Sequence, residues 1–197
     1  MKIWVKIFDI FMPNQCNYIK MRNKLLTLLK NDALYKGEVK LSSGKISNFY
    51  IDVRRVSLAS QGVYLISNLV WGLIKEDNIT AIGGPTLGAD PIVAGVCMLA
   101  HKDKRELKGF LIRKTPKEHG RQQLIEGKEL ASGERVVIID DVATSGSSLV
   151  KAVETLQKEK ISVVKAIVVI DREEGAKENL AKVNCPLVSL FTKSDFF

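Results

Sequence analysis

Short apolar runs alternate with helical patterns along this 197-residue chain, and this alternation restricts its fold more than any other feature. Runs typical of buried strands lie at residues 79–82, 110–112, 135–139, 163–170 and 187–191. Apolar residues at helical spacing lie at residues 22–31, 60–75, about 90–100 and 150–158. Because strands that alternate with helices assemble into parallel sheets, the sequence predicts an α/β fold with a helix-flanked sheet.

The length and the composition favour one domain. A chain of this size with 46% hydrophobic and 26% charged residues is able to bury one continuous core. The first 20 residues do not share the alternating pattern. We therefore expect residues 1–20 to form a loose N-terminal extension, with Met12 or Met21 as alternative starts, and residues 21–197 to form the domain.

Several classes of protein are disfavoured. Charged residues interrupt every apolar stretch before it reaches the ~18 to 20 residues of a membrane span, and Lys6 and Asp9 break up the opening segment. The cysteines at positions 16, 97 and 185 lack the spacing of a disulfide framework or a zinc site. We expect a cytoplasmic protein with no membrane partner and no metal held by its own side chains.

The formal net charge of +8 suits nucleic acid, an anionic membrane or a small polyanion, and composition does not choose among them. Between His101 and Lys128, nine Lys or Arg residues stand against four Asp or Glu residues. From charge alone, the favoured interpretation is a solvated basic loop.

Residues 136–148 read VVIIDDVATSGSS, a buried strand followed by two acids and a loop of small residues. Ligands of open α/β sheets bind at such strand ends. Residues 144–148 offer backbone N–H groups and hydroxyls at the start of a helix, which suits a phosphate monoester. Asp140 and Asp141 can accept hydrogen bonds from neighbouring sugar hydroxyls, so a ribose 5-phosphate fits both halves. The alternative is that Ser147 or Ser148 only caps a helix and the acids only end a strand, but an acid pair beside an apolar strand incurs costs that favour a functional role.

This segment resembles the diphosphoribosyl-binding motif of type I phosphoribosyltransferases. The resemblance implies a parallel sheet flanked by helices, a small N-terminal hood and a mobile active-site loop. Three further motifs, which lie within residues 22–197, are similar to those of orotate phosphoribosyltransferases. They are GEVKLSSGKISNFYIDVR at residues 37–54, RKTPKEHG at residues 113–120, and Asp171-Arg172. The hood is then expected at about residues 21–55, together with C-terminal residues.

The resemblance implies the conversion of orotate and 5-phosphoribosyl-1-diphosphate to orotidine 5'-monophosphate and diphosphate, in pyrimidine (UMP) biosynthesis. Catalysis is assigned to Lys117 and Asp141, and orotate binding to Thr144 and Arg172. The residues expected to bind the phosphoribosyl donor are Arg113, Lys114, Lys117, His119, Asp140, Asp141, Val142, Ala143, Thr144, Ser145, Gly146, Ser147 and Ser148. Mg²⁺ is expected to bind mainly through the donor. A homodimer with shared active sites is also implied, without nucleic acid as a partner.

Two positions depart from the pattern of some bacterial members. Ser42 and Gly88 stand where those members carry lysine, and the neighbouring Lys45 is a candidate for part of the missing charge. Residues 83–86 are expected to form a turn, which either presents backbone N–H groups to the diphosphate or only connects a strand to a helix.

Three other functions compete. A phosphoribosyltransferase for another base would keep residues 140–148 but change the hood and Arg172. A non-catalytic regulator that senses the donor can dispense with the basic loop, which this chain retains. A flavodoxin-like FMN protein also places a hydroxyl-rich loop after a strand, but the acid pair and the basic loop argue against it.

Overall fold

The computed structural model describes residues 15–40, 46–115 and 124–197. Its main sheet has the strand order β5-β4-β3-β6-β7-β8, and all neighbouring strands are parallel except β5, which is antiparallel to β4. The strands are β3 (Ala81–Pro85), β4 (Lys108–Ile112), β5 (Ile125–Gly127), β6 (Arg135–Ala143), β7 (Ser162–Asp171) and β8 (Leu187–Thr192). The predicted α/β fold with a mostly parallel sheet is confirmed.

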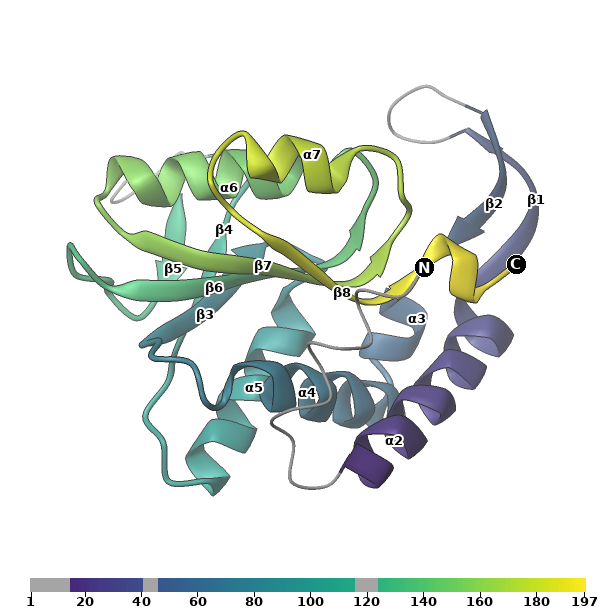
Figure 1. The fold of residues 1–197 in the computed structure, drawn as a ribbon, viewed down its shortest axis with the longest axis horizontal. Coiled ribbons are helices and arrows are strands. Elements are labelled where there is room, and N and C mark those ends of the chain that lie inside the picture. The colour runs from purple at the N-terminus through teal and green to yellow at the C-terminus, as the bar shows by residue number, and fades with distance from the viewer. Residues whose placement is uncertain (1–14, 41–45, 116–123) are drawn as a thin grey trace.

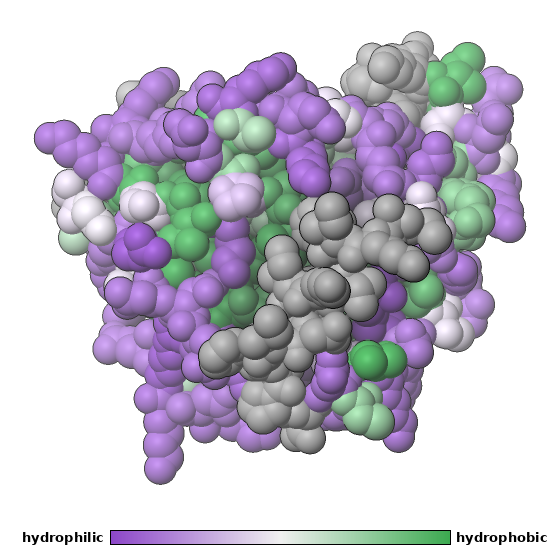
Figure 2. Space-filling model, viewed as in Figure 1, coloured by the Kyte–Doolittle hydropathy of each residue, from purple (hydrophilic) through white to green (hydrophobic). Residues whose placement is uncertain are grey.

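Helices cover both faces of this sheet (Figure 1). One face carries α4 (Ser60–Ile74) and α5 (Asp90–Lys102), and the other carries α6 (Ser147–Lys158) and α7 (Ala176–Ala181). Alternate residues of β6 serve the two cores, since Val137 and Ile139 belong to the α4 and α5 side whereas Val136 and Ile138 belong to the α6 and α7 side. Figure 2 shows hydrophilic residues over most of the visible surface, with hydrophobic residues gathered where Figure 1 shows the sheet between its helix layers.

A separate antiparallel hairpin stands at the end of the main sheet (Figure 1). It consists of β1 (Leu34–Lys40) and β2 (Ile46–Ile51), and it follows α2 (Gln15–Leu28) and a π-helical turn, Leu29–Ala33. The C-terminus returns to it through the 3-10 turn Lys193–Asp195, and the rings of Phe49 and Phe197 meet edge to face with their centroids 4.9 Å apart. We call β1, β2 and residues 193–197 the hood.

The direction in which successive strands are added to the sheet reverses between β3 and β6. From β3 it builds outward through β4 and β5, whereas from β6 it builds the other way through β7 and β8. The last pairing of β3 with β6 joins Gly83 to Ile138. Residues of β6 beyond this point have a strand on one side only, which opens a crevice at the switch in strand order.

Three local predictions were wrong. The predicted turn at Gly83 and Gly84 is part of β3, because these residues pack so closely that a Cβ atom would lie 2.2 Å from the Phe110 carbonyl oxygen and 1.9 Å from that of Ile139. The strand expected to end at Ile139 continues to Ala143, because the backbone pairing of β6 with β7 does not depend on the polarity of the side chains. Helix α2 begins at Gln15 rather than at residue 22.

The short helix α3 (Arg54–Ser57) connects the hood to α4. None of the helices in the described ranges is long and apolar enough to cross a membrane.

Candidate active site

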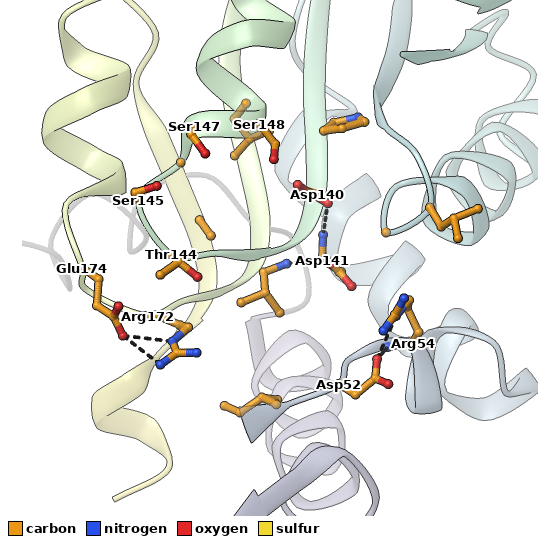
Figure 3. Close-up of a pocket in the computed structure, with 18 of the residues that line it drawn as sticks. Asp52, Arg54, Asp140, Asp141, Thr144, Ser145, Ser147, Ser148, Arg172 and Glu174 are labelled. Atoms are coloured by element: carbon orange, nitrogen blue, oxygen red, sulfur yellow. Dashed lines mark hydrogen bonds and ion pairs between the residues drawn. The ribbon is translucent and has the colours of Figure 1, made fainter. Parts of the chain in front are cut away.

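A cavity of about 680 Å³ lies at the carboxyl end of β6, between the hood and the turn that follows β3 (Figure 3). Its lining includes most of the predicted site residues, which come from β6, the start of α6, the loop between them, and the segments that follow β4 and β7. These are Lys114, Asp140, Asp141, Val142, Ala143, Thr144, Ser145, Gly146, Ser147, Ser148 and Arg172. The structure therefore brings together residues that are up to 58 positions apart (172 − 114).

The loop between β6 and α6 has the form of a phosphate cradle. Gly146 precedes the first turn of α6 with φ of 72°, a left-handed conformation that favours glycine, and a Cβ atom there would lie 3.1 Å from the Cα of Ala176. Within the described chain, no side-chain hydrogen bond caps this helix, so the hydroxyls of Ser147 and Ser148 are not used as caps. Both serines are exposed and point toward the cavity (Figure 3). Backbone N–H groups, hydroxyls and the positive helix end can then meet a phosphate.

The acid pair lies beside the cradle, near the carboxyl end of β6, where this strand still pairs with β7. The backbone N–H of Asp141 donates to Oδ1 of Asp140 over 2.9 Å, and that of Val142 donates to Oδ1 of Asp141 over 2.8 Å. Burial, and then the charge of Asp141, raise the pKa of Asp140 well above its ordinary value. Burial also raises the pKa of Asp141, although Arg54 is among the groups that oppose this shift. Hydroxyl groups that donate hydrogen bonds to this pair, or a cation beside it, would favour the charged carboxylates.

The packing around Gly88 explains why this chain has no lysine at that position. A Cβ atom at position 88 would lie 2.5 Å from Oδ1 of Asp141 and 2.6 Å from Oδ1 of Asp140. Contacts this short require the carboxylates to move. The absence of a side chain at position 88 is therefore what allows the turn after β3 to pack against the acid pair.

Arg172 reaches the cavity from the residue that follows β7. Its side chain is only 5% exposed, Nε donates to Oε1 of Glu174 over 3.0 Å, and Nη2 donates to Oγ of Ser47 over 3.2 Å. Its guanidinium carbon also lies 4.6 Å from the ring centroid of Phe49 in the hood. The side chain that the sequence assigned to orotate is thus held between β7 and the hood, at the edge of the cavity.

The predicted basic loop is only partly described. Lys114 lines the cavity, and its charge opposes the rise in the pKa of Asp140. Arg113 does not line the cavity, because its Nε donates to the Thr115 carbonyl oxygen over 3.3 Å and its Nη1 lies 3.6 Å from Oε1 of Glu126. Lys117 and His119, as well as Ser42 and Lys45, lie outside the described residues.

Comparisons with known proteins identify the family of the chain. The phosphoribosyl transferase domain family matches residues 90–192. The orotate phosphoribosyltransferase of Aquifex aeolicus is 42% identical over 177 residues, which are 88% of this chain and 96% of that relative. The chain belongs to the orotate phosphoribosyltransferase family.

Solved structures of this family share the fold. The orotate phosphoribosyltransferase of Mycobacterium tuberculosis H37Rv in complex with Fe(III) dicitrate is 34% identical, with a TM-score of 0.77 over 89% of this chain and 98% of that chain. The same enzyme in complex with 5-phospho-alpha-D-ribosyl 1-diphosphate is 31% identical, with a TM-score of 0.73 and the same coverage.

This orotate phosphoribosyltransferase family member has cavity residues for which the sequence predicted no individual role, although Asp52 and Arg54 end the motif at residues 37–54. Asp52 and Arg54 line the cavity on the hood side, and their Oδ1 and Nε atoms lie 2.9 Å apart. Glu174 lines it beside Arg172. A charged pair two residues apart and an acid two residues after an arginine are weak signals, because such pairs are common on solvated surfaces.

Proposed function

We propose that the chain transfers the phosphoribosyl group of 5-phosphoribosyl-1-diphosphate to orotate, in the pathway that makes UMP. The observation that carries this proposal is the meeting of a phosphate cradle, an acid pair and a buried arginine around one cavity. Each group matches a different part of the two substrates. The Mycobacterium tuberculosis relative, whose fold the chain shares, binds the same donor.

The cavity orders the substrates along its length. The 5-phosphate fits the cradle at residues 144–148, and the ribose hydroxyls then reach Asp140 and Asp141. Orotate lies toward the hood, where Arg172 faces its carboxylate and Thr144, the first residue of the cradle, borders the base. The remaining hydrogen-bond donors of a planar guanidinium suit a carboxylate, which distinguishes orotate from bases that lack one.

The reaction needs no covalent bond to the protein. A ring nitrogen of orotate forms a bond to the anomeric carbon, while the bond from that carbon to the diphosphate oxygen breaks and its electron pair leaves with diphosphate. The acid pair faces the sugar as it becomes positive, and fixed carboxylates in a partly buried site stabilise that charge. Positioning of both substrates supplies much of the remaining acceleration.

Cations must meet the charge that grows on diphosphate. Lys114 is already at the cavity, whereas the roles of Arg113, Lys117 and His119 remain predictions from the sequence. We infer that Lys117 is the main catalytic cation of this group. A cation that interacts more strongly with the leaving diphosphate than with the bound donor raises the rate rather than the affinity.

The residues fit Mg²⁺ that arrives with the donor. The described residues hold no cluster of three or more His, Cys, Asp or Glu side chains, so the donor's oxygens would supply most of the ligands. Asp140 and Asp141 are the carboxylates that would face the ion, and burial has left both with raised pKa values that a nearby cation would lower. When bound, Mg²⁺ would neutralise part of the diphosphate charge.

We also expect a cytoplasmic homodimer in which basic residues of one subunit serve the site of the other. This arrangement rests on the family resemblance. It would account for the position of Arg113, which in a single chain pairs with Glu126 instead of lining the cavity.

A panel of bases tests the proposal. The chain, the donor and Mg²⁺ are incubated with orotate, hypoxanthine, adenine or uracil, and the nucleotide products are separated and quantified. We expect orotidine 5'-monophosphate from orotate and no more than background from the others. Preferential use of another base would replace the proposed substrate, and binding of the donor without use of any base would favour a regulator.

A further inference from the structure

The position of the donor's diphosphate follows from stereochemistry, once the proposed function is accepted. In the α-anomer, the diphosphate lies on the same face of the ribose ring as the 2- and 3-hydroxyls. If the 5-phosphate occupies the cradle and the hydroxyls face Asp140 and Asp141, the diphosphate lies on the side of the acid pair. The turn after β3 and the start of α3 border this part of the cavity (Figure 3).

This part of the cavity needs positive charge. When they are ionised, Asp140 and Asp141 repel a diphosphate, and partial burial weakens the screening of this repulsion by water. The described lining contains three basic side chains, Arg54, Lys114 and Arg172. Arg172 serves the base and Lys114 belongs to the basic loop, which leaves Arg54 without a role.

The side chains of Arg54 and Asp141 point toward one another at the cavity (Figure 3). It is the first residue of α3, directly after the hood. Asp52 fixes it at two points, because its Oδ1 accepts hydrogen bonds from Nε over 2.9 Å and from the backbone N–H over 3.3 Å. Within the described parts of the chain, neither terminal Nη atom of Arg54 donates a hydrogen bond to the protein, so both remain available to a ligand.

The opposite wall has no room for a cation. A side chain at position 88 would begin within 2.6 Å of both carboxylates, so the turn after β3 contributes only backbone beside the acid pair. Arg54 instead approaches from the hood. We propose that Arg54 is a donor-binding residue whose guanidinium contacts the diphosphate, and that Asp52 is the positioning residue that orients it.

A purely structural role for the ion pair of Arg54 with Asp52 explains fewer of these observations. The side chains of Arg54 and Asp52 are 42% and 28% exposed, and ion pairs this accessible contribute little to stability. The charge of Arg54 also acts on the site itself, since it lowers the pKa of Asp141 against the effect of burial. The pair with Asp52 therefore contributes little to stability, whereas the charge of Arg54 acts within the cavity.

Titration calorimetry without orotate tests this inference. Donor with Mg²⁺, and separately orotidine 5'-monophosphate, which has no diphosphate, are titrated into the wild-type chain and into Arg54→Gln, Arg54→Lys and Arg55→Gln. Arg55 is the matched control, because it is the next residue of α3, is exposed and does not line the cavity. Thermal unfolding of each variant verifies that it is folded.

We expect Arg54→Gln to weaken donor binding roughly tenfold or more, the usual cost of a lost hydrogen bond between charged groups, and to change nucleotide binding less than about twofold. The donor affinity of Arg54→Lys should lie between those of the wild type and Arg54→Gln, and that of Arg55→Gln should match the wild type. Unchanged donor binding by Arg54→Gln would overturn the inference, as would an equal loss for donor and nucleotide. A wild-type chain that binds donor but never consumes orotate would instead refute the proposed function, and the titrations would still decide the role of Arg54.

Discussion

Arg172 places its Nε 3.0 Å and its Nη2 2.9 Å from the same carboxylate oxygen of Glu174. This contact fixes one edge of the guanidinium and turns the other edge toward the cavity (Figure 3). Because the ring of Phe49 also lies against it, the arginine is oriented before any base arrives. A side chain that is already ordered loses little entropy when it binds a ligand.

Arg172→Ala should therefore affect orotate far more than the donor. We expect the KM for orotate to rise by roughly 10-fold to 100-fold, the cost of a lost charged hydrogen bond of about 1.5 to 3 kcal/mol, with the donor KM within a factor of about 3. Steady-state kinetics with each substrate varied in turn measures both constants. An equal rise in the two would assign Arg172 a structural role.

Gly88→Ala tests whether the turn after β3 must pack against the acid pair. The new methyl group would begin 2.5 Å from Oδ1 of Asp141, so the carboxylates must turn away from the positions in which we propose that they bind the ribose. We expect kcat/KM for the donor to fall by roughly 10-fold or more, with a stability loss of about 1 to 3 kcal/mol. Donor kinetics and urea unfolding measure the two effects, and unchanged kinetics would show that the pair tolerates the methyl group.

The acid pair should reduce the stability of the fold. Burial and the charge of Asp141 raise the pKa of Asp140 above its unfolded value, so the folded chain holds this proton to higher pH than the unfolded chain does. Stability is then lost as pH rises from the ordinary Asp range through the raised pKa, and the deficit persists above it. Asp140→Asn removes the deficit and should raise the Tm at neutral pH, with the difference from wild type shrinking as pH falls.

Thermal unfolding across the acidic and neutral range measures this effect. Glu154→Gln, on the exposed face of α6, is the control and should change the Tm little. An Asp140→Asn chain that is less stable than wild type at neutral pH would mean that the carboxylate stabilises the fold. Such a result would weaken the case that it is retained for ligand binding.

Subunit mixing tests the expected homodimer. Lys117→Ala and Asp141→Asn chains should each be nearly inactive, but a mixed dimer with shared sites combines both changes in one site and leaves the other site intact. Activity should then return to roughly a quarter of wild type, because random mixing makes half of the dimers mixed and each has one working site. Mixed dimers that form, as shown by mass, yet recover nothing would place Lys117 in its own subunit's site.

The sequence predicted the sheet and the cradle because both are local patterns. The run from Arg135 to Ile139 and the small residues at 144–148 carry their periodicity and turn chemistry in consecutive positions. Strand ends were less predictable. Gly83 and Gly84 are typical of a turn, but they belong to β3 because its neighbours leave no room for side chains, which is a property of the assembled sheet.

The hood side of the cavity could not be predicted in the same way. Arg54 and Asp141 are separated by 87 positions (141 − 54), and only the fold brings them together in the lining of one cavity. The contact of Arg172 with Ser47 and Phe49 joins residues that are even more remote in the chain. Electrostatic partners of this kind follow from tertiary packing, which no local sequence pattern encodes.

The most direct test of the central claim is the amount of orotidine 5'-monophosphate that the wild-type chain and the Asp140→Asn, Asp141→Asn double variant form from orotate, donor and Mg²⁺ in one assay. We predict that the wild type forms one nucleotide for each orotate consumed. The rate of a folded double variant should be lower by roughly 100-fold or more, since two charged contacts to the ribose are lost. A wild-type chain that forms no nucleotide would contradict the proposed reaction. A double variant as active as wild type would contradict the proposed site.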